Sequence, residues 1–175
     1  MRLFIAVELP EAMMDALAET QAMLRDAIRG RFTAPNGLHV TLAFLGEVPH
    51  SRIAETSRAL ENACSCSNAF HALLGDLGWF DERDNAIVWQ GFADPTPFTV
   101  LAQDVRRELD AIGIDYDRKP LKAHVTLMRR ANLTEGLLPT PICVAGIISA
   151  VTLFASNLTP RGPVYTPLYT VELTQ

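Results

Sequence analysis

Cysteine is scarce in this chain, with only three in 175 residues, and no two of them form a Cys-x-x-Cys pair. An odd number of cysteines without that spacing disfavours both a disulfide framework and a structural zinc site. We therefore expect Cys64, Cys66 and Cys143 to be ordinary core or surface thiols in a reducing compartment.

The N-terminus lacks a long hydrophobic run. Its first apolar stretch covers only residues 3–7 before Glu8, and no signal-peptide cleavage pattern follows. Such a stretch is far too short to cross a membrane, so we interpret it as a buried strand. We therefore expect a cytoplasmic protein without a membrane partner.

An excess of basic residues is also absent, because 20 acidic residues outnumber 15 lysines and arginines and the net charge is −5. This balance disfavours a protein that coats long stretches of nucleic acid, although a local phosphate site remains compatible with it. With 49% hydrophobic and 20% charged residues, the composition is that of a folded globular chain. Its length suits one domain over residues 1–175.

Strands and helices are predicted to alternate along the whole chain. Apolar periodicity predicts helices over 10–30 and 96–113 and a weaker one over 51–64. In the first two, Pro10 and Pro97 lie near the start, Gly30 and Gly113 mark the end, and Thr96 is the expected cap. Short β-branched or aromatic segments predict strands over 2–9, 39–46, 70–80, 86–92, 124–129, 148–156 and 164–173.

The tetrapeptide His-Val-Thr-Leu occurs twice, at 39–42 and at 124–127, so the two copies lie 85 positions apart. The same offset carries residues 3–7 onto 88–92, Pro10 onto Pro95, and the first predicted helix onto the one over 96–113. The tetrapeptide is therefore the sharpest part of a strand–helix–strand repeat. We expect two similar lobes that face each other across a central cleft, where equivalent residues meet.

Each copy of the tetrapeptide has two faces, because residues two apart in a strand point the same way. His39 and Thr41 share one face, and His124 and Thr126 share the corresponding face of the second copy. A pseudo-twofold arrangement would bring two imidazoles and two hydroxyls into one cleft. Two histidines can form a general acid–base pair near neutral pH, and threonine hydroxyls can bind an anionic oxygen.

The second copy lies in the most basic stretch of the chain, which has five cations and no acid between residues 118 and 130. Arginine suits phosphate, so Arg129 is a candidate ligand for it. Regular alternation, however, places Met128 on the His/Thr face and Arg129 on the opposite one. Arg129 reaches the cleft only if the strand carries a bulge or ends there.

Other candidate residues are weaker. A lone histidine in an apolar strand is usually structural, so we assign no role to His50 or His71. No Asp, Glu or Cys stands at ligand spacing from either motif, so we expect neither a metal nor another cofactor. Aromatic faces stack on RNA bases, which makes Phe44, Trp79 and Trp89 candidates, but alternation places Phe44 on the packing side. Arg161 is a loop cation that either contacts phosphate or is solvated.

The two motifs and their flanks resemble the two-histidine (2H) phosphoesterase superfamily, which is defined by a pair of H-x-[ST]-x motifs. The chain is most similar to bacterial and archaeal RNA 2′,3′-cyclic phosphodiesterases, once described as 2′-5′ RNA ligases. The similar segments are RLFIAVELP, LHVTLAFLGEV, HVTLMR and LFASNLTPRGPVYTPL, which span nearly the whole chain. One departure is RKPLKAHVTL, where relatives often have another histidine or a proline just before the motif.

This resemblance implies an α+β fold of two lobes, each an antiparallel sheet with outer helices. It also implies metal-independent hydrolysis of an RNA 3′-terminal 2′,3′-cyclic phosphate to a 2′-phosphate. By position, His39 is the proton donor, His124 is the proton acceptor, and Thr41, Thr126 and Arg129 hold the phosphate. The implied partner is RNA with a cyclic phosphate end, with tRNA fragments among the candidates, and we expect a monomer. The reverse reaction would join such an end to a 5′-hydroxyl in a 2′-5′ linkage.

Two alternatives stay open at this point. The same chemistry could act on a small nucleoside or ADP-ribose cyclic phosphate. A non-enzyme alternative is a module that binds RNA ends without turnover, but retention of both histidines, both threonines and Arg129 argues against it.

Overall fold

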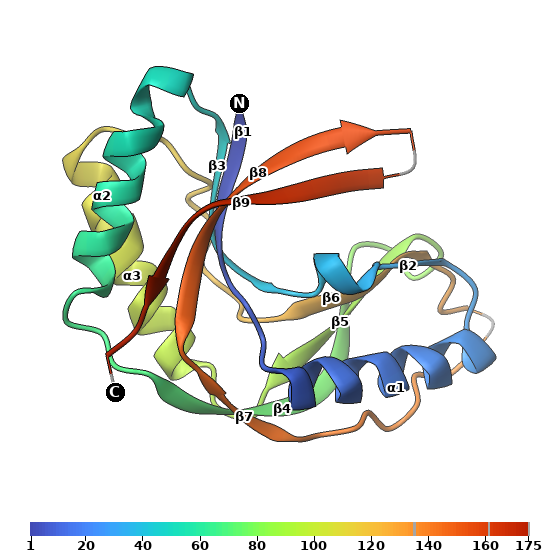
Figure 1. The fold of residues 1–175 in the computed structure, drawn as a ribbon. Helices are drawn as coiled ribbons and strands as arrows, with labels where there is room; N and C mark the ends of the chain where they lie inside the picture. The colour runs from blue at the N-terminus through green and yellow to red at the C-terminus, as the bar shows by residue number, and fades with distance from the viewer. Residues whose placement is uncertain (135, 161, 175) are drawn as a thin grey trace.

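Two antiparallel sheets face each other in the computed structural model, which describes residues 1–134, 136–160 and 162–174 (Figure 1). The four-stranded sheet has the order β3 (Val40–Glu47), β1 (Arg2–Val7), β8 (Ala150–Thr159) and β9 (Gly162–Glu172). The five-stranded sheet has the order β2 (Arg31–Phe32), β6 (Val125–Ala131), β5 (Ala86–Phe92), β4 (Phe70–Phe80) and β7 (Ala145–Ile148).

Among the described residues, three α-helices cover the outer sides of the sheets: α1 (Glu11–Ala27), α2 (Ile53–Cys64) and α3 (Thr96–Ala111). The predicted α+β fold of two lobes with outer helices is therefore confirmed. No helix in the described part of the chain is long and apolar enough to cross a membrane.

Helices α1 and α3 are exchanged between the lobes. Helix α1 follows β1 of the four-stranded sheet but packs on β6 and β7 of the five-stranded one, where Gln21 Nε2 donates hydrogen bonds to the carbonyls of Thr33 and Leu127, both at 2.9 Å. Helix α3 follows β5 of the five-stranded sheet but packs on β3 of the four-stranded one. Because each sheet is covered by a helix that follows a strand of the other, we propose that residues 1–175 form a single domain with an internal repeat.

The strand pairing refines the expected offset. Ala6 of β1 pairs with Thr41, and Trp89 of β5 pairs with Thr126. Positions on the first strand of each half therefore correspond at an offset of 83 and not 85. The expected match of residues 3–7 with 88–92 is wrong by two positions, because the ladder hydrogen bonds set the register independently of the helix that follows.

Both motif strands carry a β-bulge directly after the threonine. In β3, Leu42 is the extra residue between the pairs that Ile5 and Ala6 make, and in β6 Leu127 holds the same place opposite Val88 and Trp89. An extra residue places two consecutive side chains on the same side of the strand. Each bulge therefore reverses the alternation of the residues that follow it.

This reversal corrects two expectations. Met128 was predicted on the His/Thr face, but it is fully buried in the core, and Arg129 is exposed in the cleft. Phe44 was predicted to lie on the packing side, but it is half-buried and lines a cavity with His39 and Thr41.

The ends of several elements also differ from the prediction. Helix α1 ends at Ala27, before Gly30. Thr96 is the first residue of α3 and not its cap, because Pro95 holds the cap position without a side-chain hydrogen bond, and the backbone N–H of Thr96 donates to Asp94 Oδ1 at 2.9 Å. The strand expected over 148–156 is interrupted at Ser149, where β7 ends and β8 begins in the other sheet.

The three cysteines are free thiols, as expected. Cys64 is buried, and burial raises the pKa of its thiol to about 11. Cys66 and Cys143 are exposed.

Phe98 at the start of α3 is a central core residue, fully buried with its ring centroid 4.3 Å from that of Phe92 and 5.1 Å from that of Phe70. The variant Phe98→Ala leaves a cavity among these rings, so we expect it to lower the free energy of unfolding by about 3–5 kcal/mol. Urea denaturation followed by circular dichroism measures the change. The matched control is Val100→Ala on the exposed side of α3, which we expect to change stability by less than about 0.5 kcal/mol. Equal losses in both variants would contradict this assignment of the core.

Candidate active site

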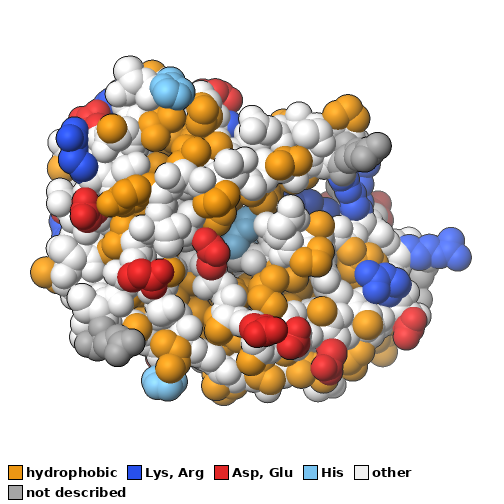
Figure 2. Space-filling model, in the orientation of Figure 1, with side chains coloured by type: hydrophobic (Ala, Val, Ile, Leu, Met, Phe, Trp, Pro, Cys, Tyr) orange, Lys and Arg blue, Asp and Glu red, His pale blue; other side chains and the backbone are white. Residues whose placement is uncertain are grey.

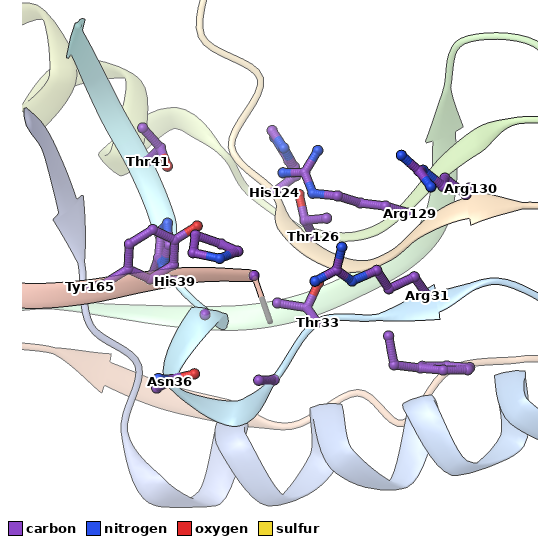
Figure 3. A pocket seen from close by; sticks show the side chains of 15 residues that line it. Arg31, Thr33, Asn36, His39, Thr41, His124, Thr126, Arg129, Arg130 and Tyr165 are labelled. Atoms are coloured by element: carbon purple, nitrogen blue, oxygen red, sulfur yellow. The ribbon is translucent and has the colours of Figure 1, made fainter. Parts of the chain in front are cut away.

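A cavity of about 450 Å³ lies between the two sheets. On the face of the molecule in Figure 2, a histidine side chain is visible in a hollow of the surface. All five side chains singled out from the sequence line the cavity (Figure 3). They are His39, Thr41, His124, Thr126 and Arg129. Each histidine immediately precedes its strand, and each threonine is the second residue of that strand. The two halves of the repeat therefore contribute the same pair of side chains to one cleft, as the sequence predicted.

Aromatic rings hold His39. Its imidazole stacks on Phe4 at a centroid distance of 5.0 Å, and the ring of Tyr165 meets it edge-on at 5.4 Å. Burial lowers the pKa of His39 from 6.5 to about 4, and the nearby charges of His124 and Arg129 act in the same direction. With this pKa, His39 is a neutral imidazole at pH 7.

A backbone carbonyl orients His124. Its Nδ1 lies 2.6 Å from the carbonyl oxygen of Lys122. Because a carbonyl only accepts hydrogen bonds, Nδ1 carries the hydrogen, and in the neutral ring Nε2 is left with a free lone pair. Burial lowers the pKa of His124, the bond to Lys122 opposes that shift, and the charges of Arg129 and Lys122 lower the pKa further. A neutral imidazole with a free Nε2 is suited to accept a proton.

Two aromatic rings, those of Phe80 and Trp89, pack against His124. The ring of Phe80 lies edge-on to it at 5.0 Å, and Trp89 lies at 6.1 Å. Lys122 Nζ lies 4.1 Å from the Trp89 ring centroid, so the lysine makes a cation–π contact with one of the rings beside His124. Glycine is required at position 78, because a Cβ there would lie 2.3 Å from the Trp89 ring.

The two tryptophans considered as RNA-stacking candidates therefore differ. Trp89 is half-buried beside His124, whereas Trp79 is exposed and has the guanidinium carbon of Arg83 5.8 Å from its ring centroid. Neither lines the cavity that contains the two histidines.

The hydroxyls of Thr41 and Thr126 make no hydrogen bond to any other described residue, so both are available to a ligand. In Figure 3 the guanidinium group of Arg129 lies beside His124 and Thr126. Its positive charge lowers the pKa of both histidines. The β6 bulge thus brings Arg129 to the site, one of the two routes that the sequence left open.

Several lining residues were not predicted from the motifs. Arg31 of β2, Asn36 of the turn at Pro35–Gly37, and Tyr165 of β9 all line the cavity. Arg31 also reaches across to the β8–β9 hairpin, since a Cβ on Gly162 would lie 2.7 Å from its Nη2. Gly162 and Tyr165 fall in the segment LFASNLTPRGPVYTPL, whose resemblance to the family could have indicated them as site residues. Arg161 in the same segment lies outside the described residues.

The described part of the chain contains no group of three or more His, Cys, Asp and Glu side chains placed to hold a metal ion. His50 and His71 are exposed, and neither lines the cavity.

Comparison with known proteins gives consistent results. Residues 7–89 match the model of the LigT-like phosphoesterase family. The chain is 33% identical over 174 residues to the RNA 2′,3′-cyclic phosphodiesterase of Thermus thermophilus, covering 96% of this chain and 88% of that protein. It is 32% identical over 178 residues to the protein of the same name from Escherichia coli, covering 99% and 97%. A crystal structure of E. coli LigT complexed with 3′-AMP superposes with a TM-score of 0.83 at 28% identity, covering 99% of this chain and 98% of that one.

Proposed function

Because the chain belongs to the LigT-like phosphoesterase family, we propose that it hydrolyses the 2′,3′-cyclic phosphate at the 3′ end of RNA to a 2′-phosphate. The observation that carries this proposal is the convergence of both His-x-Thr pairs and Arg129 on one cavity between the sheets. The cavity joins proton-transfer groups to donors for an anionic oxygen, which is what phosphodiester hydrolysis needs.

In the proposed mechanism, the phosphorus lies between the two histidines. Nε2 of His124 takes a proton from water as the water oxygen forms its bond to phosphorus. The bond from phosphorus to the ribose O3′ breaks, and His39 gives its proton to the departing oxygen. Thr41, Thr126 and Arg129 donate to the non-bridging oxygens, where negative charge builds up in the transition state.

The proton-donor role of His39 depends on the substrate. The pKa of His39 is about 4, because burial and the positive charges of His124 and Arg129 disfavour its protonated form. A bound cyclic phosphate brings a negative charge that offsets those positive charges. We infer that substrate binding raises the pKa of His39 and so loads it with the proton that it later gives to the leaving oxygen.

The pH dependence of kcat/KM follows from the pKa values of the free enzyme. Above both pKa values the two histidines are neutral and the proton donor is lost, and below both they are protonated and the acceptor is lost. Since the pKa of His39 is about 4 and burial also lowers the pKa of His124, we expect a bell-shaped profile with its maximum on the acid side of neutral pH. The profile of kcat should lie at higher pH. Initial rates measured across the acid and neutral range test this, and a kcat/KM maximum well above pH 7 would contradict it.

The direct test is hydrolysis of a short oligoribonucleotide with a 2′,3′-cyclic end, carried out in chelator, with the position of the product phosphate assigned by NMR. We expect full activity without added divalent metal and a product with a 2′-phosphate and a free 3′-hydroxyl. A requirement for metal, or a 3′-phosphate product, would contradict the mechanism. Nucleoside and ADP-ribose cyclic phosphates, assayed in parallel, test the small-substrate alternative.

We further propose that tRNA fragments are among the substrates, that the protein is a cytoplasmic monomer, and that a 5′-hydroxyl can replace water as the nucleophile. When a 5′-hydroxyl takes the place of water, the same bond to phosphorus forms and the same bond to O3′ breaks, which gives a 2′-5′ linkage, and formation of that linkage between two oligomers tests this ligation. Light scattering of the purified protein tests the monomer.

A further inference from the structure

A second cavity, of about 330 Å³, adjoins the first. The two share five lining residues, which are His39, Thr41, Arg129, Pro163 and Tyr165. The walls that belong to the second cavity alone are Arg2, Phe4, Phe44, Ser156 and Leu158. The two cavities therefore meet at His39 and the β9 residues beside it.

The composition of this second cavity suits a nucleobase. Phe44 is half-buried, and the guanidinium carbon of Arg2 lies 4.8 Å from its ring centroid. Leu158 adds an apolar wall and is 70% exposed. Bases of single-stranded RNA stack on aromatic rings and on guanidinium planes, and such sites use positive charge to hold the backbone.

The charge of the lining residues also favours a nucleotide as the ligand of the second cavity. None of the described residues that line either cavity is Asp or Glu, although acidic residues outnumber basic ones in the whole chain. The first cavity has Arg31, Arg129 and Arg130, and the second adds Arg2. A continuous cationic path thus runs through both cavities, as expected for a ligand with more than one phosphate.

The reacting phosphate binds in the first cavity and not in the second. The first contains both histidines and both threonines, and its volume is in the range that holds one small ligand. The second touches one histidine and one threonine, so it does not hold the reacting phosphate by itself. What enters it must be attached to the nucleotide whose cyclic phosphate lies between the histidines.

We propose that the second cavity binds the nucleotide on the 5′ side of the terminal cyclic nucleotide, with its base stacked on Phe44 and Arg2. This inference rests on the proposed function and specifies its substrate, which is an RNA chain of at least two nucleotides. The β3 bulge is what makes this subsite, because it turns Phe44 from the packing side to the side of His39 and Thr41.

The test compares kcat/KM for a dinucleotide with a 2′,3′-cyclic end and for the mononucleoside 2′,3′-cyclic phosphate. We expect the parent protein to prefer the dinucleotide by roughly five- to hundredfold, the range that one stacked base supplies. The variant Phe44→Leu should bring this ratio close to one, because the dinucleotide loses more than the mononucleotide. Trp79→Leu is the matched control, since Trp79 is an exposed aromatic residue outside both cavities, and it should leave the ratio unchanged.

A second variant keeps the proposal testable if Phe44→Leu does not fold. Leu158 is largely exposed, so Leu158→Asp should fold, and its negative charge should also lower the dinucleotide preference. Equal rates on the two substrates in the parent protein, or an unchanged ratio in both variants, would overturn the proposal while leaving the proposed function intact. Failure of the parent protein to hydrolyse either substrate would instead refute the proposed function itself.

Discussion

Replacing His124 by alanine should lower kcat for hydrolysis of an oligoribonucleotide with a 2′,3′-cyclic end by about 10²–10⁴-fold. The variant removes the group that accepts the proton from the attacking water, and a positioned general base contributes a factor of this size. His124 is suited to that role because Nδ1 lies 2.6 Å from the Lys122 carbonyl and Nε2 is left free. Single-turnover rates on the parent and the variant measure the effect.

The controls for this experiment are His50→Ala and His71→Ala. Both residues are exposed and lie outside the cavity, so we expect both variants to keep the parent rate. A His124→Ala variant that folds normally and also keeps the parent rate would remove the proposed base from the mechanism.

The two histidines can be told apart with the variant His39→Ala and a second substrate. With the cyclic oligonucleotide, His39→Ala should also lose about 10²–10⁴-fold in kcat, because the ribose oxygen leaves poorly without a proton. With a nitrophenyl phosphodiester, whose leaving group needs no proton, His39→Ala should lose much less than His124→Ala. The opposite order would exchange the two roles.

Replacing Arg129 by alanine should lower kcat/KM by about 10²–10³-fold, the cost of removing one fixed donor to a developing oxyanion. Arg129→Lys should recover only part of the loss, because an ammonium group does not reproduce the planar fork that binds two phosphate oxygens. The charge of Arg129 lowers the pKa of both histidines. We therefore also expect Arg129→Ala to raise both pKa values and to move the pH profile of kcat/KM upward.

The matched control is Arg107→Ala on α3, an exposed arginine paired with Asp104. It should leave both the rate and the pH profile unchanged. Titration of the histidine ring signals by NMR measures the pKa values independently of activity. If Arg129→Ala leaves both pKa values and the rate unchanged, Arg129 is not part of the site.

The local sequence pattern predicted most elements and the histidine and threonine side chains that meet in one cavity. In each His-Val-Thr-Leu copy the valine begins a strand, and the valine and leucine are buried. The segments over 70–80 and 86–92 are strands with those bounds. Strand periodicity and a repeated motif are properties of neighbouring residues, so they can be read without knowing the fold.

The positions of Phe44 and Arg129 could not be predicted in this way. Both follow a bulge, and a bulge is set by how a strand pairs with its neighbour, β1 for Phe44 and β5 for Arg129. Helix exchange between the lobes is likewise a matter of packing, since the amphipathic pattern of α1 shows that one face is buried but not against which sheet.

By itself, then, the sequence determined that two imidazoles and two hydroxyls occur in equivalent strands of an acidic chain, because these features depend on residue type and short spacing. Only the tertiary structure decided which nitrogen of His124 is free, how far the pKa of His39 falls, and that Tyr165 and Arg31 join the site. These properties arise from burial and from contacts between segments that are far apart in the chain. For the same reason, the structure and not the sequence shows a second cavity beside the first.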